Sequence, residues 1–388
     1  MSYETILSPV NYGGMILKNR IVFAPTTMGL RQKEYFEKIR EIAAGGCAMM
    51  IIGDVPVGKS RFGPSLFSDR GFAFYRELAR IAHEYDCRLC AQLHQNDTVM
   101  TGMFRYLPGL IRGKYSRADL KTLMIGQTGD YITELPAETV KEITDAFGTA
   151  ALRAVEAGFD MIQVHGDRMC GSFSSSLFNR RTDCYGGSPR NRAKFACDAV
   201  AAVRAALPEI PIDYKLAVRQ EAPHYGNAGV LEEELPVFVP MLEQAGVTGF
   251  HVTLADHGRL EDTIPPADHP EFGCQGCFLK FCDEVRSLTS LPICGVGALS
   301  DPDFVEAQLA SGRIDCAAMS RQLIADPQWV NKLRENRCGD IHRCIRCNKK
   351  CLGGMYDHSG VHCIYEGADR NDLRNRVQQP NGKHRIAG

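Results

Sequence analysis

Short apolar runs alternate with longer amphipathic stretches between Arg20 and Ser320. Eight of these runs have the length and apolar content of buried strands, and helical patterns separate them. The runs are RIVFAP, AMMIIGDV, RLCAQLH, FDMIQVHG, IPIDYKLAV, VTGFHVTLA, LPICGVGA and IDCAAMS. Eight parallel strands with intervening helices predict an α/β fold, the TIM (β/α)8 barrel, because a doubly wound sheet normally uses fewer strands. Polar residues gather where these runs end, Asp54 and His251 among them, which is where a barrel carries its chemistry.

Two stretches fall outside the alternation. The segment from Asn96 to Leu135 lacks a clear periodicity, and we predict a loop excursion above the barrel mouth that could cover a substrate. After Leu333 the chain becomes rich in Cys, Lys, Arg and Gly without a sustained apolar pattern. We therefore divide the chain into a barrel at residues 1–336 and a short C-terminal segment at residues 337–388.

The composition excludes several classes of protein. A chain of 388 residues that is 44% hydrophobic can bury a sizeable core. Its 45 Lys and Arg balance 46 Asp and Glu, so nothing indicates a nucleic acid or an anionic membrane as partner. No apolar run approaches the roughly 20 residues of a membrane helix, and the N-terminus does not resemble a signal peptide. We expect a cytoplasmic homo-oligomer that acts on small molecules.

Sixteen cysteines are many for a reducing compartment, where disulfides are rare. Four of them form a CxxCxxxC motif with a fourth cysteine after eleven further residues: Cys344, Cys347, Cys351 and Cys363. Thiolates at this spacing can converge on a tetrahedral zinc ion or on an iron–sulfur cluster, and the compressed spacing favours the cluster. The other cysteine group, Cys274, Cys277 and Cys282, has only three thiols, and packing is its simpler interpretation.

The segment FNRRTDCYGGSPRNRAKF, at residues 178–195, resembles the NxRxDxYGGSxxNRxRF signature of the old yellow enzyme family. Members of that family are flavin-dependent ene-reductases built on TIM barrels. The segments LKNRIVFAPTT, CAQLH, CGVGALSDPDF and AMSRQLIADPQW fit the same family in the same order. The cysteine spacing is similar to that of the dienoyl-CoA reductase and trimethylamine dehydrogenase branch, which carries a 4Fe-4S cluster beside the barrel.

This resemblance implies FMN across the barrel mouth. Lys215 stands where the family has an Arg near the flavin N1 and O2, and a cation there stabilises the anionic reduced flavin. The motifs after strands seven and eight imply a phosphate site. The implied cofactor residues are Pro25, Thr26 and Thr27 at the ring edge, Gly53, Gln92 at the pyrimidine ring, Lys215, and Gly297, Ser320 and Arg321 at the phosphate.

The active-site motif departs from the family pattern. Relatives usually carry a second His and a Tyr proton donor where this chain has HGDRMC, with Arg168 and Cys170. The string resembles a branch of the family that converts bilirubin to urobilinogen. Our hypothesis is that Arg168 binds a substrate carbonyl or carboxylate, while Asp167 orients Arg168 or relays a proton. A structural ion pair between Asp167 and Arg168 is the alternative.

Two histidines complete the candidate catalytic set. The resemblance implies that His165 hydrogen-bonds substrate or flavin and that His257 assists protonation, although a satisfied core histidine would explain His165 as well. Cys170 is more simply a side chain that fills the space of the absent Tyr, and the role of His94 is open.

We therefore expect an ene-reductase that transfers hydride from FMN N5 to a conjugated C=C bond of a tetrapyrrole such as bilirubin. The alternatives are another enone, such as an unsaturated acyl-CoA or an oxo-bile acid, and a catalytically silent iron–sulfur electron-transfer subunit. An acyl-CoA would suit the cations Arg105, Arg112, Lys114 and Arg117. No GxGxxG follows a strand, so we expect electrons from NAD(P)H to arrive through a separate flavodoxin-like or flavin reductase protein. Direct reduction of FMN by NAD(P)H is the alternative, and the cluster could also be purely structural.

Overall fold

Eight parallel strands close into a barrel in the computed structural model, which describes residues 3–60, 63–97, 108–109, 111–114 and 117–366. Each strand pairs with its neighbours along the chain, and β6 pairs with β7 and β11 with β3, so the ring is continuous. These strands coincide with the eight apolar runs, and the predicted TIM barrel is confirmed. The barrel strands are β3 Ile21–Phe23, β4 Met49–Pro56, β5 Arg88–His94, β6 Met161–His165, β7 Ile212–Arg219, β9 Gly249–Leu254, β10 Ile293–Gly295 and β11 Cys316–Met319.

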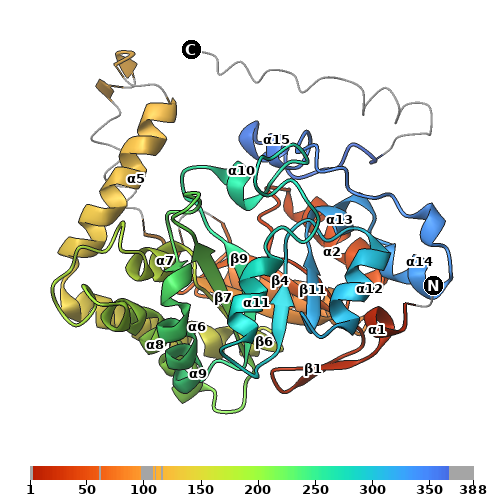
Figure 1. The fold of residues 1–388 in the computed structure, drawn as a ribbon, viewed down its shortest axis with the longest axis horizontal. Coiled ribbons are helices and arrows are strands. Elements are labelled where there is room, and N and C mark those ends of the chain that lie inside the picture. Colours follow the sequence, from red (N-terminus) through yellow and green to blue (C-terminus); the bar gives the residue numbers. More distant parts are fainter. Residues whose placement is uncertain (1–2, 61–62, 98–107, 110, 115–116, 367–388) are drawn as a thin grey trace.

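Helices cover the outside of this ring (Figure 1). The sequence sets the N-terminus of α8, for example. The Ser188 hydroxyl accepts a hydrogen bond from the Asn191 N–H, and Pro189 begins the helix where no intrahelical N–H is needed. The covering helices are α2 Gln32–Ala44, α3 Asp69–His83, α6 Ala137–Glu156, α8 Pro189–Ala206, α9 Leu235–Ala245, α11 Leu279–Arg286, α12 Pro302–Ala310 and α14 Trp329–Arg334. The shorter elements are α1 Glu4–Leu7, β8 Val230–Leu231, η1 Glu232–Glu234, α7 Arg168–Ser174, α10 Leu260–Thr263, α13 Arg321–Ala325, η2 Cys338–Asp340 and α15 Leu352–Tyr356.

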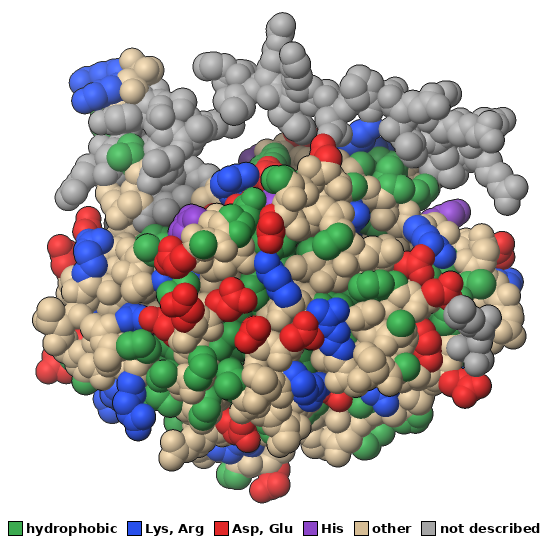
Figure 2. Space-filling model, in the orientation of Figure 1, with side chains coloured by type: hydrophobic (Ala, Val, Ile, Leu, Met, Phe, Trp, Pro, Cys, Tyr) green, Lys and Arg blue, Asp and Glu red, His purple; other side chains and the backbone are tan. Residues whose placement is uncertain are grey.

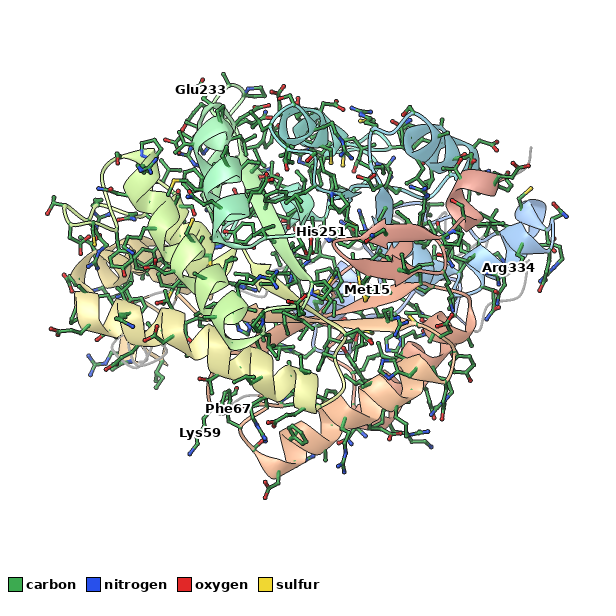
Figure 3. The ribbon with its side chains drawn as sticks, turned by 90° about the horizontal axis from the view of Figure 1, so that it is seen from below. Met15, Lys59, Phe67, Glu233, His251 and Arg334 are labelled. Atoms are coloured by element: carbon green, nitrogen blue, oxygen red, sulfur yellow. The ribbon has the colours of Figure 1, made fainter. Side chains whose placement is uncertain are left out.

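An antiparallel hairpin of β1 (Val10–Tyr12) and β2 (Met15–Leu17) closes one end of the barrel. Seen from below, the hairpin that carries Met15 lies against this end of the strands (Figure 3). Tyr12 and Leu17 are fully buried and pack with inward-facing residues of the strands, such as Met49 and Met161. This end is therefore plugged, and α10 and α15 lie at the opposite end (Figure 1).

The prediction of a loop over residues 96–135 is wrong for its second half, which is the 18-residue helix α5, Arg117–Glu134. The helix projects beside the barrel mouth (Figure 1). Strong helix formers such as Leu, Lys, Met and Gln account for it, but without an apolar stripe it has no amphipathic period to detect. Arg105 lies outside the described residues, whereas the Arg112 and Lys114 side chains are exposed.

The C-terminal segment packs back onto the barrel through two buried polar side chains of the α13 region. Gln322 Oε1 accepts from the Cys344 N–H at 2.8 Å, and its Nε2 donates to the His342 carbonyl at 3.1 Å. Asp326 Oδ2 accepts from the His342 N–H at 2.8 Å and pairs with Lys332 at 2.6 Å. These bonds fix the start of the cysteine-rich segment against the end of the barrel opposite the hairpin.

Acidic and basic side chains are interspersed over the face seen in Figure 2, as expected from the balanced composition. None of the helices in the described ranges is long and apolar enough to cross a membrane.

Candidate active site

A cavity of about 290 Å³ opens at the carboxyl ends of the barrel strands. All the predicted cofactor and catalytic residues line it: Pro25, Thr26, Thr27, Gly53, Gln92, His165, Asp167, Arg168, Lys215, His257, Gly297, Ser320 and Arg321. They come from every part of the barrel and meet only because parallel strands point their carboxyl ends to one side. The cavity is thus the candidate active site.

One wall is shaped by an irregularity in β4. The register with β5 shifts between Ile52 and Val55, and Asp54 there adopts a left-handed backbone with φ of 54°. The Asp54 carboxylate accepts a hydrogen bond from the Thr27 hydroxyl. Burial opposes ionisation of Asp54, but the charge of Arg168 above all lowers its pKa to about 2. Asp54 is an anionic member of the site whose role was not predicted, although its place at a strand end is visible in the sequence.

Lys215 supplies a cation at the same wall. Within the described ranges its ammonium makes no hydrogen bond and no ion pair. Burial lowers the pKa of Lys215, while the charges of Asp167 and Asp54 partly offset that effect. A half-buried cation without a partner among the described residues favours an anion in the cavity, as a reduced flavin would provide.

His251 lies beside Lys215 in the register of β7 and β9, inside the ring of strands (Figure 3). Its Nδ1 is buried without a hydrogen-bond partner among the described residues. Burial lowers the pKa of His251 to about 3, so the ring is neutral. The orphaned nitrogen is a second sign that a polar group belongs in this cavity.

The ends of β10 and β11 carry the predicted phosphate residues. Ser320 Oγ accepts from Thr26 Oγ1 at 2.7 Å, which ties the first strand end to the last. Gly297 has a φ of 119°, and a Cβ there would lie 3.0 Å from Cys277 Sγ and from the Phe278 nitrogen, so no other residue fits. Arg321 donates to the Pro265 carbonyl at 2.9 Å and to Asn348 Oδ1 at 2.6 Å, and is thereby held at the rim.

His257 is held between two carboxylates. Its Nε2 hydrogen-bonds Asp167, and its Nδ1 lies 3.4 Å from Asp97 Oδ2. Ser172 Oγ donates to the same Asp97 oxygen at 2.5 Å, and the Phe178 ring stacks on the imidazole with centroids 5.8 Å apart. Burial opposes the charged form, but Asp167 and then Asp97 raise the pKa of His257 above its usual 6.5. The two carboxylates therefore favour the protonated imidazole.

Asp97 was missed by the sequence analysis. It is buried, at 3% exposure, and follows β5 at the margin of a segment without any periodicity. Only its place three residues after a strand end distinguishes it from other loop aspartates.

Arg168 begins α7 with a left-handed backbone, at a φ of 48°. Asp167 accepts from the Arg168 backbone N–H at 2.7 Å, and its carboxylate pairs with His257 rather than with the guanidinium. No hydrogen bond or ion pair to the Arg168 guanidinium exists within the described part of the chain, and the side chain is exposed to the cavity. Burial opposes its charge, but Asp167, Asp54 and Asp97 raise its pKa. Arg168 is a charged side chain held in a left-handed backbone and open to a ligand.

The remaining candidates are less accessible. His165 Nδ1 accepts from the Asp167 N–H at 3.3 Å, and burial together with Lys215 holds the pKa of His165 well below 6.5. Cys170 is buried and does not line the cavity, and burial raises the pKa of its thiol. His94 is likewise buried and outside the cavity lining.

Cys344, Cys347, Cys351 and Cys363 line one smaller cavity in the C-terminal segment. Cys344, Cys351 and Arg321 also line the main cavity, so the two share a wall. Among the described residues no three His, Cys, Asp or Glu side chains lie close enough together to hold one metal ion. Cys277 and Cys282 of the other cysteine group are buried, and Cys274 is exposed.

Comparison with known proteins agrees with this geometry. Residues 5–340 match the model of the NADH:flavin oxidoreductase / NADH oxidase family. The chain is 59% identical to a bilirubin reductase of Clostridium symbiosum, over 94% of this chain and 98% of that protein. It is 34% identical to a bilirubin reductase of Mediterraneibacter gnavus over 98% of this chain, but it spans only 59% of the length of that relative.

Solved structures share the fold at low identity. A 2-naphthoyl-CoA reductase in complex with 2-naphthoyl-CoA superposes with a TM-score of 0.74 at 21% identity, over 96% of this chain and 58% of that one. Morphinone reductase in complex with tetrahydroNAD gives 0.62 at 18% identity, over 86% of this chain and 91% of that one. With the family model over most of its length and close similarity to one bilirubin reductase, the chain belongs to the NADH:flavin oxidoreductase / NADH oxidase family, the old yellow enzyme family, and is an oxidoreductase.

Proposed function

We propose that this oxidoreductase is an FMN-dependent ene-reductase whose substrate is bilirubin or a closely related tetrapyrrole, and that its product is urobilinogen. The observation that carries the proposal is Arg168, a cation open to the cavity and next to the protonated pair of His257 and Asp167. Bilirubin carries two propionates and two lactam carbonyls, which suit a guanidinium as partner. The similarity to two bilirubin reductases supports the same substrate.

The cavity fits FMN because the Lys215 ammonium and the His251 Nδ1 have no partner among the residues that the structure describes. FMN, when bound, supplies hydride transfer to an electron-poor carbon of a conjugated C=C bond. Lys215 and Gln92 would hold the ring, and Ser320, Arg321 and the backbone at Gly297 the phosphate.

Residues of the protein supply the proton that the reduced C=C bond takes up. His257 stores it between Asp97 and Asp167, and Asp167 is the most accessible of the three, with 20% of its side chain exposed against 9% for His257 and 4% for Asp97. We infer that the proton passes from His257 through Asp167 to the substrate carbon, while Arg168 fixes the substrate by a propionate or a lactam oxygen. His165, neutral beside Lys215, accepts from the backbone and holds the turn between β6 and α7 in place.

The four cysteines suit a 4Fe-4S cluster better than one zinc ion. A tetrahedral ion with metal–sulfur bonds of about 2.3 Å needs its sulfurs within about 4 Å of one another. A cluster gives each iron its own thiolate and accepts a wider arrangement, and all four thiols line the same smaller cavity of the C-terminal segment. Cys344, Cys347, Cys351 and Cys363 would hold the cluster, which supplies one-electron transfer beside the flavin cavity. We propose that NAD(P)H is the ultimate reductant and that a separate flavodoxin-like or flavin reductase protein delivers its electrons.

The test is an anaerobic assay of the purified protein with dithionite as electron source. We expect FMN to be released on denaturation and bilirubin absorbance to disappear in proportion to enzyme. The same assay on cinnamate, an enoyl-CoA and an oxo-bile acid measures the competing substrates. Reduction of one of these compounds while bilirubin stays unchanged would refute bilirubin as the substrate. Flavin binding without reduction of any of them would refute the proposed ene-reductase activity. Rapid stoichiometric bleaching of the flavin by NADH alone would remove the need for a separate donor.

A further inference from the structure

A chain of four buried polar side chains runs from the cavity into the core of the barrel. Gln92 Nε2 donates to Gln163 Oε1 at 2.6 Å, Gln163 Nε2 donates to Asp213 Oδ2, and the Tyr12 hydroxyl donates to Asp213 Oδ1 at 2.7 Å. All four are nearly inaccessible, with Gln92 the most exposed at 2%. Gln92 alone of the four lines the cavity. The other three have no role in the mechanism above.

The strand register builds this chain. Gln92 on β5 stands opposite Gln163 on β6, and Gln163 stands opposite Asp213 on β7, so the three side chains form one layer inside the barrel. The next position in the layer is Gly249 on β9. A Cβ at Gly249 would lie 3.1 Å from Tyr12 Cζ, so the missing side chain makes room for the phenol to reach Asp213.

Donor and acceptor chemistry gives the chain a direction. Both Asp213 oxygens accept, one from the Tyr12 hydroxyl and one from Gln163 Nε2, so Gln163 turns its NH2 group to Asp213 and its carbonyl to Gln92. Gln92 must then give an N–H to Gln163, and its carbonyl faces the other way, 3.5 Å from the Asp54 N–H at the cavity wall. A carboxamide without such a partner could bind with either end.

We propose that Asp213 is a positioning residue that acts through Gln163 to fix which end of the Gln92 carboxamide faces the bound flavin. The inference rests on the proposed FMN site. It states that the Asp213 carboxylate, which reaches Gln92 through Gln163, decides whether the carbonyl or the NH2 group of Gln92 faces the flavin.

The surroundings of Asp213 fit this role. Burial raises the pKa of Asp213 to about 7, and the hydrogen bonds from Gln163 and Tyr12, then the charge of Lys215, oppose that rise. The thiols of Cys294 and Cys316 lie near the Tyr12 hydroxyl and carry no charge at neutral pH. If this part of the barrel interior served only for packing, apolar side chains would be expected in place of Asp213, since a buried carboxyl group costs stability unless it is fully hydrogen-bonded.

The experiment is a double-mutant cycle on FMN binding to the deflavinated protein, measured by quenching of flavin fluorescence. We expect Asp213→Asn to raise the Kd for FMN about tenfold, because asparagine offers either a donor or an acceptor and no longer sets the direction. Gln163→Leu should raise the Kd for FMN by the same factor. The double variant Asp213→Asn/Gln163→Leu should bind FMN no more weakly than the weaker-binding single variant. The absorption maximum of bound FMN should shift in both single variants.

Tyr12→Phe is the matched control, because it removes the other donor to Asp213 and leaves Gln163 untouched. It is compared with the wild type at alkaline pH, where Asp213 stays ionised without the Tyr12 hydroxyl. Its Kd should stay within about twofold of wild type. Multiplicative effects in the double variant, an unchanged Kd for Asp213→Asn, or an equal loss in Tyr12→Phe would overturn the inference. Should Asp213→Asn fail to fold, an unchanged Kd for Gln163→Leu would overturn it alone. A wild-type protein that does not bind FMN would instead refute the proposed cofactor.

Discussion

Replacement of Arg168 by alanine tests the substrate site directly. The guanidinium makes no hydrogen bond or ion pair with another described residue, so its loss breaks none of these. It does remove the charge that lowers the pKa of Asp54, so that pKa should rise in the variant. The left-handed backbone at a φ of 48° penalises arginine and alanine alike, because both carry a Cβ. The substitution therefore removes the interaction with the ligand and the positive charge that acts on Asp54, and it adds no backbone strain.

A charge-assisted hydrogen bond contributes about 1.5 to 3 kcal/mol, and the exposure of Arg168 to the cavity argues for a value near 2 kcal/mol. We expect kcat/KM for bilirubin to fall about 30-fold, since each 1.36 kcal/mol is a factor of ten. Arg168→Lys should recover only part of the rate, because an ammonium makes no bidentate contact with a carboxylate. Steady-state anaerobic kinetics with dithionite measures both variants.

The dimethyl ester of bilirubin separates the two groups that Arg168 could bind. If Arg168 holds a propionate, the ester should be a poor substrate of the wild type, and Arg168→Ala should then change its rate little. If it holds a lactam oxygen, the 30-fold loss should persist with the ester. A kcat/KM within about threefold of wild type for bilirubin, or about 0.65 kcal/mol, would refute the assignment altogether.

Four further predictions concern the site. The raised pKa of His257 means that its proton is lost only as pH rises through that value, so kcat should fall on the alkaline side, and His257→Gln should remove this limb of the kcat–pH profile. Lys215→Met should make the potential of the bound flavin about 30 mV more negative in a spectroelectrochemical titration, because the anionic reduced form loses a cation. Cys347→Ser should lower the iron content per protein in a colorimetric assay while the barrel melts as before; unchanged iron would refute the ligand assignment. In Gly166→Ala the new Cβ would lie 2.1 Å from the Lys215 carbonyl, so urea denaturation should show a loss of about 1–3 kcal/mol.

Strand positions could be predicted because a parallel barrel buries both faces of each strand and leaves continuous apolar runs. Helix α5 could not, since it carries no apolar stripe. Its sequence is a helix by propensity alone, which is the weaker signal.

Some residues of the site could likewise be predicted from the sequence, and others could not. Residues at strand ends, such as Gln92 and Lys215, could be placed from sequence because the fold brings all strand ends together. Asp97 could not, because only the contact with His257 distinguishes it. Gln163 and Asp213 did carry a signal, as polar residues within the otherwise buried runs MIQVH and IDYKLAV, but only the register shows that they face one another.

The bond between Tyr12 and Asp213 joins residues 201 positions apart in the sequence, which bears on how the protein forms during synthesis. At about 5 to 20 residues per second, a ribosome makes Asp213 some 10 to 40 seconds after Tyr12. During that interval the hairpin exposes the phenol ring of Tyr12 and the side chain of Leu17 without the strands that later bury them. The hairpin can thus complete its docking only after β7 has been made, and a nascent chain halted before Gly249 should be a good client for chaperones that bind apolar peptides.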